Sequence, residues 1–505
     1  MFDSKKLKLP AYTAGIIGFF GGLLIHLFGL ITVIHNSDDI HCQPVGYGTG
    51  VSSGRWLLTL LGDFLKNNEL NYNLGFFNGL AYIALLAIAA GILVSIFKIK
   101  RRQIAALVSL ILVSFPTACS TLLYKYTSPL YGVAFLLSVF AVWILPKRKI
   151  LGLILSSVSI ACSLGIYQAY LPMTVAVYVL RLFQMNLEED SQFKEILYKG
   201  LYAILSLILG LLIYFAVTKI SLAYYGRVLN EYQGINEMGK ITLAELPELI
   251  ARAYRYYFCL PLNDYCNLAT NRMLKVIYAL IYTINVVLSA AILMQKKKPV
   301  GNVIMALLLG VVFPISVNLI EIMCPNSRIY TLMVFSCSVS ALVPCLLLEQ
   351  LDRPAKVTMK CVGIVLVLFV IFNTYFNNLT YTSLYYVNRQ TENYMNAMIT
   401  QIRMADGFSV DKKWAFIGTN KDPMVKNKWQ AVPVYGGAEH TNRMISAYSW
   451  KDWIPQYLGI SISMADDASI NEIKQMREFQ EMACWPNDGS IRVINDIVVI
   501  KFQED

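Results

Sequence analysis

The stretch AYTAGIIGFFGGLLIHLFGLITVI, Ala11–Ile34, contains no Asp, Glu, Lys or Arg. A helix needs about 20 consecutive apolar residues to cross the hydrocarbon core of a bilayer. Similar runs recur along this chain of 505 residues, which is 56% hydrophobic and 15% charged, with a mean hydropathy of +0.52. Membrane β-barrels show short alternating segments instead. The sequence therefore predicts a polytopic α-helical membrane protein.

Eleven apolar runs are predicted to span the membrane. They cover residues 12–34, 74–97, 103–121, 128–145, 151–166, 169–184, 199–219, 273–294, 300–320, 329–349 and 357–376. If the spans alternate, basic clusters such as Lys98–Arg102 and Lys296–Lys298 fall on one side. Because basic loops stay in the cytoplasm, the N-terminus is predicted to be cytoplasmic and residues 377–505 to lie outside.

The formal net charge of +11 would suit a nucleic-acid partner in a soluble protein. Here the basic residues occupy short loops between apolar runs, where they fix orientation. We therefore expect the lipid bilayer as a partner and no nucleic acid. Ten cysteines are present, without metal-binding spacing, and whether Cys259 and Cys266 pair is left open.

Two domains are expected. Residues 1–376 form the membrane domain, with outer loops 35–73 and 220–272. Residues 377–505 change in composition and predict a small extracytoplasmic α/β domain. In that region KWAFIG, Lys413–Gly418, is typical of a strand, Ser469–Met482 of a helix with a capping box, and Asn495–Asp496 of a hairpin turn.

The first outer loop holds an acid pair, Asp38 and Asp39, in HNSDDIHCQPVGYGTGVSSGRW, residues 35–56. Adjacent acids at a helix end are often simply solvated. One carboxylate can also serve as a general base toward a hydroxyl while the other positions it or holds a cation. The following residues 52–65 have apolar side chains at helical spacing, which predicts a helix on the outer membrane surface. Arg55 and Trp56 join the acids as candidate substrate-binding residues.

His35 and His41 with the two aspartates are chemically adequate metal ligands. Their spacing matches no established site, so we expect no metal site. Whether the protein uses a divalent cation as a cofactor is left open.

Other outer residues could recognise a sugar phosphate. Lys125 and Arg328 could pair with phosphate, because cationic side chains bind its oxygens, or could reach toward lipid headgroups. Tyr167 and Gln168 in GIYQAY could bond a sugar or belong to an aromatic belt. Asp264 in PLNDYCN could bind a hydroxyl or cap a helix.

Taken together, the order of these motifs resembles a known family. The acid pair is followed by GRW (Gly54–Trp56), by SLGIYQAYLP (Ser163–Pro172) at a span turn, by a large outer loop and by the tail CWPNDGSIRVINDIVVIKF (Cys484–Phe502). Over nearly the whole chain this is similar to the bacterial serotype-converting O-antigen glucosyltransferases, Gtr type II.

The resemblance implies a GT-C architecture in the bacterial cytoplasmic membrane. It implies transfer of a hexose, glucose in the family's name, from undecaprenyl phosphate to a surface polysaccharide such as O-antigen or another cell-wall glycan. The role of the first-loop aspartate, base or acceptor-positioning residue, then falls on Asp38 or Asp39. The alternative is a lipid-linked sugar flippase or other transporter. That function needs a polar pathway, whereas the middle of most spans carries no charge.

Overall fold

The computed structural model of the protein describes residues 4–189, 191–231, 238, 240–260, 266–269, 271–351, 356–419, 435 and 449–503. The chain divides into two compact units, each described by itself. The helical unit comprises Met1–Ile31, Pro44–Thr380 and Pro433–Gly437, and the C-terminal unit comprises Thr32–Gln43, Tyr381–Val432 and Ala438–Asp505.

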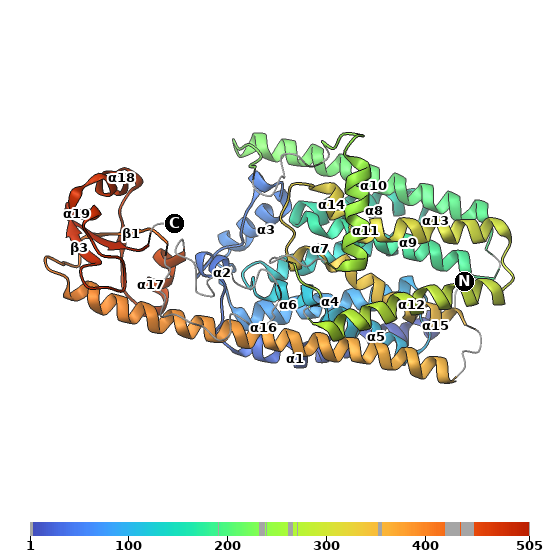
Figure 1. The fold of residues 1–505 in the computed structure, drawn as a ribbon. Helices are drawn as coiled ribbons and strands as arrows, with labels where there is room; N and C mark the ends of the chain where they lie inside the picture. Colours follow the sequence, from blue (N-terminus) through green and yellow to red (C-terminus); the bar gives the residue numbers. More distant parts are fainter. Residues whose placement is uncertain are drawn as a thin grey trace. The chain divides into compact units, whose positions relative to one another are not determined.

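Helices build almost all of the helical unit (Figure 1). They are α1 (Ser4–Ile31), η1 (Val51–Ser53), α3 (Trp56–Asn67), α4 (Gly75–Ile96), α5 (Arg102–Ser114), α6 (Pro116–Leu122), α7 (Ser128–Ile144), α8 (Lys149–Ile166), η2 (Gln168–Tyr170), α9 (Leu171–Leu187), α10 (Phe193–Tyr224), α11 (Leu246–Cys259), α12 (Arg272–Gln295), α13 (Val300–Val317), α14 (Ile320–Met323), η4 (Thr331–Met333), η5 (Phe335–Ser338), α15 (Val339–Gln350) and the first part of α16 (Lys356–Met404).

Seven of these helices are long and apolar enough to cross a membrane, among the residues described. They are α1 from Lys8, α4, α8, α10, α12, α13 and α16. An eighth span results if α5 and α6, bent by 47°, count together. The predicted eleven spans are therefore not confirmed. Helices α7 and α9 have 17 residues each, so each extends only about 26 Å, short of a hydrocarbon core of about 30 Å.

Two departures from the predicted spans have local causes. Pro116 lacks a backbone N–H, and Phe115 before it is extended (φ −61°, ψ 141°), which separates α5 from α6. The predicted span 329–349 starts with two 3₁₀ turns, and its α-helix begins only at Val339. In this stretch Ser336 Oγ donates to Val317 O at 2.6 Å, the kind of side-chain bond that competes with regular helix.

Small residues let the first helices approach closely. Helix α1 packs against α4 and α5, and α4 packs against α7. A Cβ at Gly22 would lie 2.7 Å from Ile83, and one at Gly18 would lie 3.4 Å from the Cα of Ala87. Such glycine contacts are typical of helix pairs in membranes, where association depends on close van der Waals packing.

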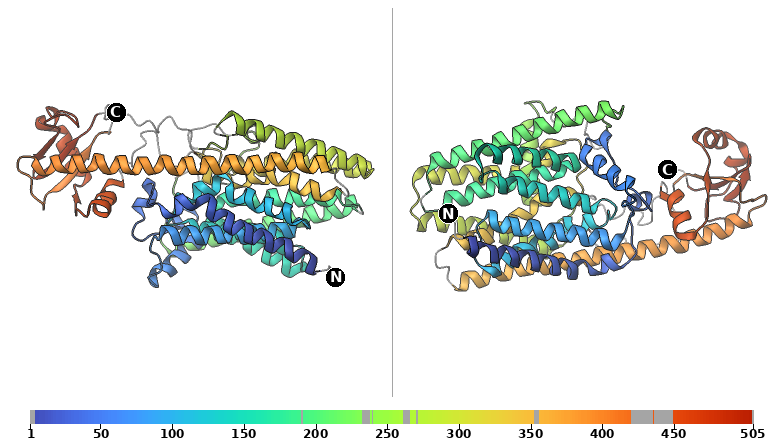
Figure 2. Two further views of the ribbon diagram at one scale, coloured as in Figure 1. Left: turned by 90° about the horizontal axis from the view of Figure 1, so that it is seen from below. Right: turned by 180° about the vertical axis from the view of Figure 1, so that it is seen from behind.

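The C-terminal unit holds a four-stranded sheet of order β2-β1-β4-β3. Its elements are α2 (Ser37–His41), the last part of α16, β1 (Lys413–Ile417), α17 (Trp450–Leu458), β2 (Ser463–Met464), α18 (Asp467–Gln475), α19 (Arg477–Gln480), β3 (Ile491–Ile494) and β4 (Ile497–Lys501). Strand β1 pairs in parallel with β2 and β4, and β3 pairs antiparallel with β4. Figure 2 shows that α16 is one unbroken helix.

The hairpin and strand predictions for this unit are confirmed. Asn495 and Asp496 have φ of 47° and 63°, as a tight two-residue hairpin turn requires. The predicted helix Ser469–Met482 is instead two helices, α18, which begins at Asp467, and α19, and the capping box predicted at Ser469 is wrong. Helix α18 is capped by Asp466, whose side chain accepts from Ser469 N at 2.9 Å, and it ends at Gln475.

Two apolar layers cover the sheet, since side chains alternate along each strand. Trp414, Val498 and Ile500 face a core shared with α16 and α17. Ala415, Ile417 and Val499 face a core shared with α18 and α19. Ile40 of α2 belongs to the first core and is 0% exposed, so the acid-bearing segment is part of the C-terminal unit.

Candidate functional site

The two adjacent aspartates have different surroundings. Both lie in the short helix α2, where Asn36 is the N-cap and its Oδ1 accepts from Asp39 N at 2.7 Å. Asp38 is exposed, whereas Asp39 is 0% exposed. Local geometry thus distinguishes two acids that the sequence alone leaves equivalent.

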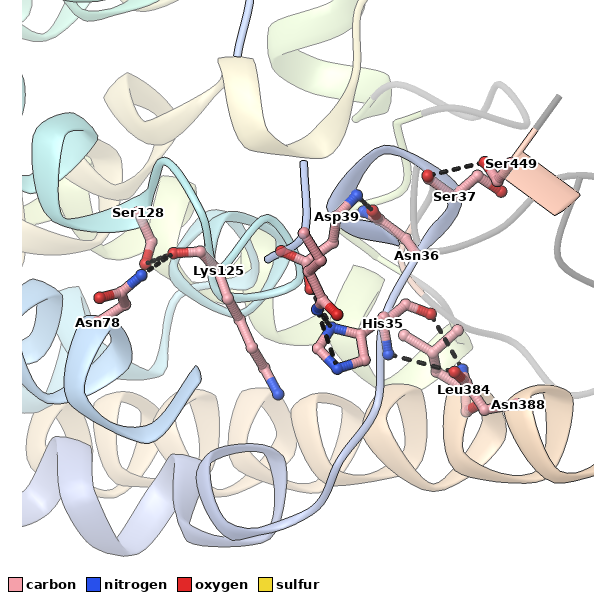
Figure 3. A network of polar contacts seen from close by, with 11 residues as sticks. His35, Asn36, Ser37, Asp39, Asn78, Lys125, Ser128, Leu384, Asn388 and Ser449 are labelled. Carbon is pink, nitrogen blue, oxygen red and sulfur yellow. Dashed lines mark hydrogen bonds and ion pairs between the residues drawn. The ribbon is translucent and has the colours of Figure 1, made fainter. Parts of the chain in front are cut away.

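Asp39 is paired with His35 (Figure 3). Its Oδ2 bonds His35 Nδ1, and the Gln43 amide nitrogen lies 2.7 Å from the same ring nitrogen. One ring nitrogen either donates to the carboxylate or accepts from the amide, so the two contacts alternate with the tautomer of His35. Bonding His35 therefore orients the Asp39 carboxylate.

The second histidine has a different partner. His41 Nδ1 lies 2.7 Å from Asp452 Oδ2 in α17, and this pair is partly exposed. No group of three or more His, Cys, Asp and Glu side chains that could hold a metal ion occurs among the described residues. No disulfide joins the ten cysteines, all of which fall within the described ranges.

A tyrosine adjoins the His35–Asp39 pair. The ring centroid of Tyr457 lies 6.1 Å from that of His35. Burial raises the pKa of its phenol, and the charges of Asp39 and Glu392 raise that pKa further. Tyr457 therefore stays protonated at neutral pH and presents a hydroxyl rather than a second anion beside Asp39.

In the helical unit the structure brings two predicted motifs together. Arg55 Nη1 donates to Thr49 Oγ1 at 2.7 Å and to Tyr131 OH at 3.0 Å. The guanidinium carbon lies 5.0 Å from the ring centroid of Tyr167, which stacks on Tyr131 at 4.2 Å. A cation over an aromatic face is held by the ring's quadrupole. Arg55 and Tyr167 therefore form one cluster, although they lie far apart in the sequence.

Gln168 and Trp56 also connect the segment around Arg55 with the GIYQAY motif. Gln168 Nε2 donates to Ser53 O at 2.7 Å and to Tyr214 OH at 3.1 Å. An amide NH₂ has two hydrogens, so a sugar could reach only the Oε1 atom. A Cβ at Gly165 would lie 2.5 Å from the ring of Trp56. Trp56 therefore packs directly on the backbone of the GIYQAY motif.

The predicted surface helix exists as α3. Leu58, Thr59 and Gly62 face inward, while Leu60 and Phe64 are exposed. This apolar exposed face fits a helix that lies at a membrane surface. Its placement there stays a prediction.

The remaining predicted site residues, Lys125, Arg328 and Asp264, differ in their surroundings. Lys125 is buried, and its main-chain oxygen accepts from Asn78 Nδ2 at 3.0 Å and from Ser128 Oγ at 3.2 Å (Figure 3). Arg328 is exposed in the loop between α14 and η4. Asp264 lies outside the described residues.

The structure contains a partly buried ion pair whose contact the sequence does not predict. Arg252 Nε lies 2.8 Å from Glu321 Oε2, and its Nη2 donates to Glu321 O at 3.2 Å and to Pro325 O at 2.8 Å. These bonds tie α11 to α14 and to the loop that carries Arg328. The sequence shows each residue but not their contact, since 69 positions separate them.

The carboxyl of Glu321 is expected to make the stability of the folded protein depend on pH. Burial, opposed by Arg252, raises the pKa of Glu321 from 4.5 to about 7. The folded state therefore keeps a proton that the unfolded chain releases. The resulting contribution of Glu321 to the free energy of unfolding is fully present below about pH 4.5 and is lost as the pH rises through about 7. The shift corresponds to roughly 3 kcal/mol at most.

We expect Glu321→Gln, which stays neutral, to lose less thermal stability than the wild type between about pH 5 and about pH 8. Melting of detergent-purified protein at both pH values measures this. Glu472→Gln, at an exposed position of α18, is the matched control. An identical pH dependence in wild type and Glu321→Gln would show that this carboxyl does not titrate as described.

The seven long apolar helices define an integral membrane protein. A family model described as Glucosyl transferase GtrII matches residues 27–341, more than half of the chain. The protein belongs to this glucosyl transferase family, which confirms the resemblance. The match includes the acid pair and both motifs around Arg55 and Tyr167, whereas the tail from Cys484 lies beyond it. No curated protein and no solved structure matches the chain.

Proposed function

We propose that the protein transfers a hexose from undecaprenyl phosphate to a hydroxyl of a surface polysaccharide, such as O-antigen or another cell-wall glycan. The family match supports glycosyl transfer, and the apolar helices fit a lipid-linked donor. The basic loops of the sequence support the proposal that the N-terminus is cytoplasmic and that residues 377–505 and the reaction lie on the outer face of the bacterial cytoplasmic membrane.

The pairing of buried Asp39 with His35 is the observation that carries the proposal. The acceptor hydroxyl oxygen attacks the anomeric carbon of the donor, and its proton passes to the Asp39 carboxylate. The bond between that carbon and the phosphate oxygen breaks, and its electron pair stays on the phosphate. The products are the glycoside and polyprenyl phosphate. Exposed Asp38 positions the acceptor.

The leaving phosphate gains negative charge as the glycosyl bond breaks, and preorganised cations stabilise that charge. Arg328 is the proposed phosphate partner because it is an exposed residue and a guanidinium can bind two phosphate oxygens at once. Lys125 is a second cationic candidate. Trp56, Tyr167 and the Gln168 oxygen are proposed sugar contacts, with Arg55 holding the Tyr167 ring in place. Asp264 is proposed to bind a hydroxyl.

A reconstituted assay tests this function. The purified protein is placed in vesicles with a panel of polyprenyl-phosphate hexoses in the leaflet that faces the acceptor polysaccharide. We expect labelled hexose to appear on the acceptor, with one donor strongly preferred. Movement of intact donor across the bilayer without transfer to the acceptor would instead identify a transporter.

A further inference from the structure

The side chain of Asn388 holds the main chain of His35 through two hydrogen bonds. Asn388 lies in α16 and is 8% exposed. Its Oδ1 accepts from His35 N at 3.3 Å, and its Nδ2 donates to His35 O at 3.0 Å (Figure 3). A carboxamide carries an NH₂ donor and a C=O acceptor side by side, so it can satisfy both polar groups of one residue, and its Nδ2 also donates to Leu384 O at 2.9 Å. This clamp fixes the backbone of the residue that bonds Asp39.

Two more side chains of the C-terminal unit hold helix α2. Ser449 Oγ donates to Ser37 O at 2.8 Å, and both residues are buried. Asp452 of α17 pairs with His41 at the other end of α2. Both ends of this five-residue helix are therefore bonded to the segment that begins at Ser449.

Apolar packing completes this attachment. Ile40 lies between the two bonded ends and is fully buried in a core with Met395, Met398 and Trp453. A helix of five residues is not stable by itself, because too few intrahelical bonds offset the cost of nucleation. The conformation of α2 therefore depends on the bonds and packing that the C-terminal unit supplies.

We propose that the C-terminal unit acts as the scaffold that positions the base, and that Asn388 is a positioning residue in it. This inference rests on the proposed function of Asp39. A general base must be held close to its productive geometry by packed neighbours and outer hydrogen bonds. Misplacement by about 1 Å can cost about 100-fold in rate. Asn388 holds the main chain of His35, and His35 in turn orients Asp39. The C-terminal unit thus contributes to turnover although Asn388 touches no substrate.

Asn388→Ala tests the scaffold role in the full-length protein with a polyprenyl-phosphate hexose donor. We expect kcat to fall by about 10- to 100-fold while the KM values for donor and acceptor stay within about twofold. Amide hydrogen exchange in the peptide 32–43 should become several-fold faster, because this segment loses its clamp. Asn393→Ala, at an exposed asparagine of the same helix, is the matched control and should behave as the wild type.

The outcomes separate this inference from the function on which it rests. If Asp39→Asn stays active in the same assay, the proposed base is wrong. If Asp39→Asn is inactive but Asn388→Ala keeps wild-type kcat, the scaffold role is overturned. A raised KM for the acceptor at unchanged kcat would also overturn it and would assign the unit to acceptor binding.

A second variant tests the scaffold role if Asn388→Ala does not fold. If Asn388→Ala loses its cooperative melting transition, Ser449→Ala takes its place, since it removes only the hydrogen bond to Ser37 O. The scaffold role predicts a lower kcat with unchanged KM for this variant as well. Wild-type kcat together with unchanged exchange in the peptide 32–43 would contradict it.

Discussion

Asp39→Asn is expected to lower the rate of hexose transfer by about 10²–10⁴-fold, the contribution of a general base. Asparagine keeps the size of the side chain and can still bond His35, but it cannot accept the hydroxyl proton. The protein should therefore insert and melt as the wild type does. The measurement is kcat with purified protein and a polyprenyl-phosphate hexose donor.

Asp38→Asn is the matched control for this prediction, because it removes the neighbouring charge at an exposed position of the same helix. We expect a loss of less than about tenfold, as suits a residue that only positions the acceptor. The reverse order of effects would assign the base to Asp38. Full activity of both single variants and of the double variant would eliminate the aspartate mechanism.

Gly165→Ala is expected to destabilise the helical unit by about 1–3 kcal/mol through overpacking. The new Cβ would lie 2.5 Å from Cε2 of Trp56 and 2.8 Å from two further atoms of its ring. The indole would have to leave the backbone of α8, which would separate the GRW motif from the GIYQAY motif. Thermal melting in detergent and hexose transfer should both decline.

Gly363→Ala provides a control of opposite sign. A Cβ at Gly363, inside helix α16, would meet no atom within 4 Å. Alanine is favoured over glycine in a helix interior by about 1 kcal/mol, so this variant should melt at the same or a slightly higher temperature. Equal melting of the two variants would show that Trp56 does not require the bare backbone at Gly165.

The sequence predicted helices well because apolar runs are a strong signal. The predicted count of eleven membrane spans is not confirmed, because the number of spans depends on where each helix begins and ends. Helix α7 is as apolar as a span but has only 17 residues. The stretch 329–349 has the composition of a span, yet its buried serines and threonine accompany 3₁₀ turns that composition does not predict. Strand β1 and the turn at Asn495 were predictable because their signals are local.

The candidate site was predictable as a set of segments but not as a set of contacts. The acid pair and the GRW and GIYQAY motifs can all be found in the sequence. The pairing of Asp39 with His35 depends on a short helix whose conformation is imposed from elsewhere. Asn388 lies 353 positions from His35, so no local pattern connects them. The contact of Arg252 with Glu321 is equally nonlocal.

Product stoichiometry gives the most direct test of the central claim, that this protein is a hexosyl transferase using a polyprenyl-phosphate donor. Purified protein is incubated with doubly labelled donor and polysaccharide acceptor, and both products are quantified for wild type and Asp39→Asn. The account predicts one polyprenyl phosphate released for each hexose joined to the acceptor, and both products formed at least about 100-fold more slowly with Asp39→Asn. Donor that stays intact with the wild-type protein in the presence of the acceptor, or release and transfer undiminished by Asp39→Asn, would contradict the account.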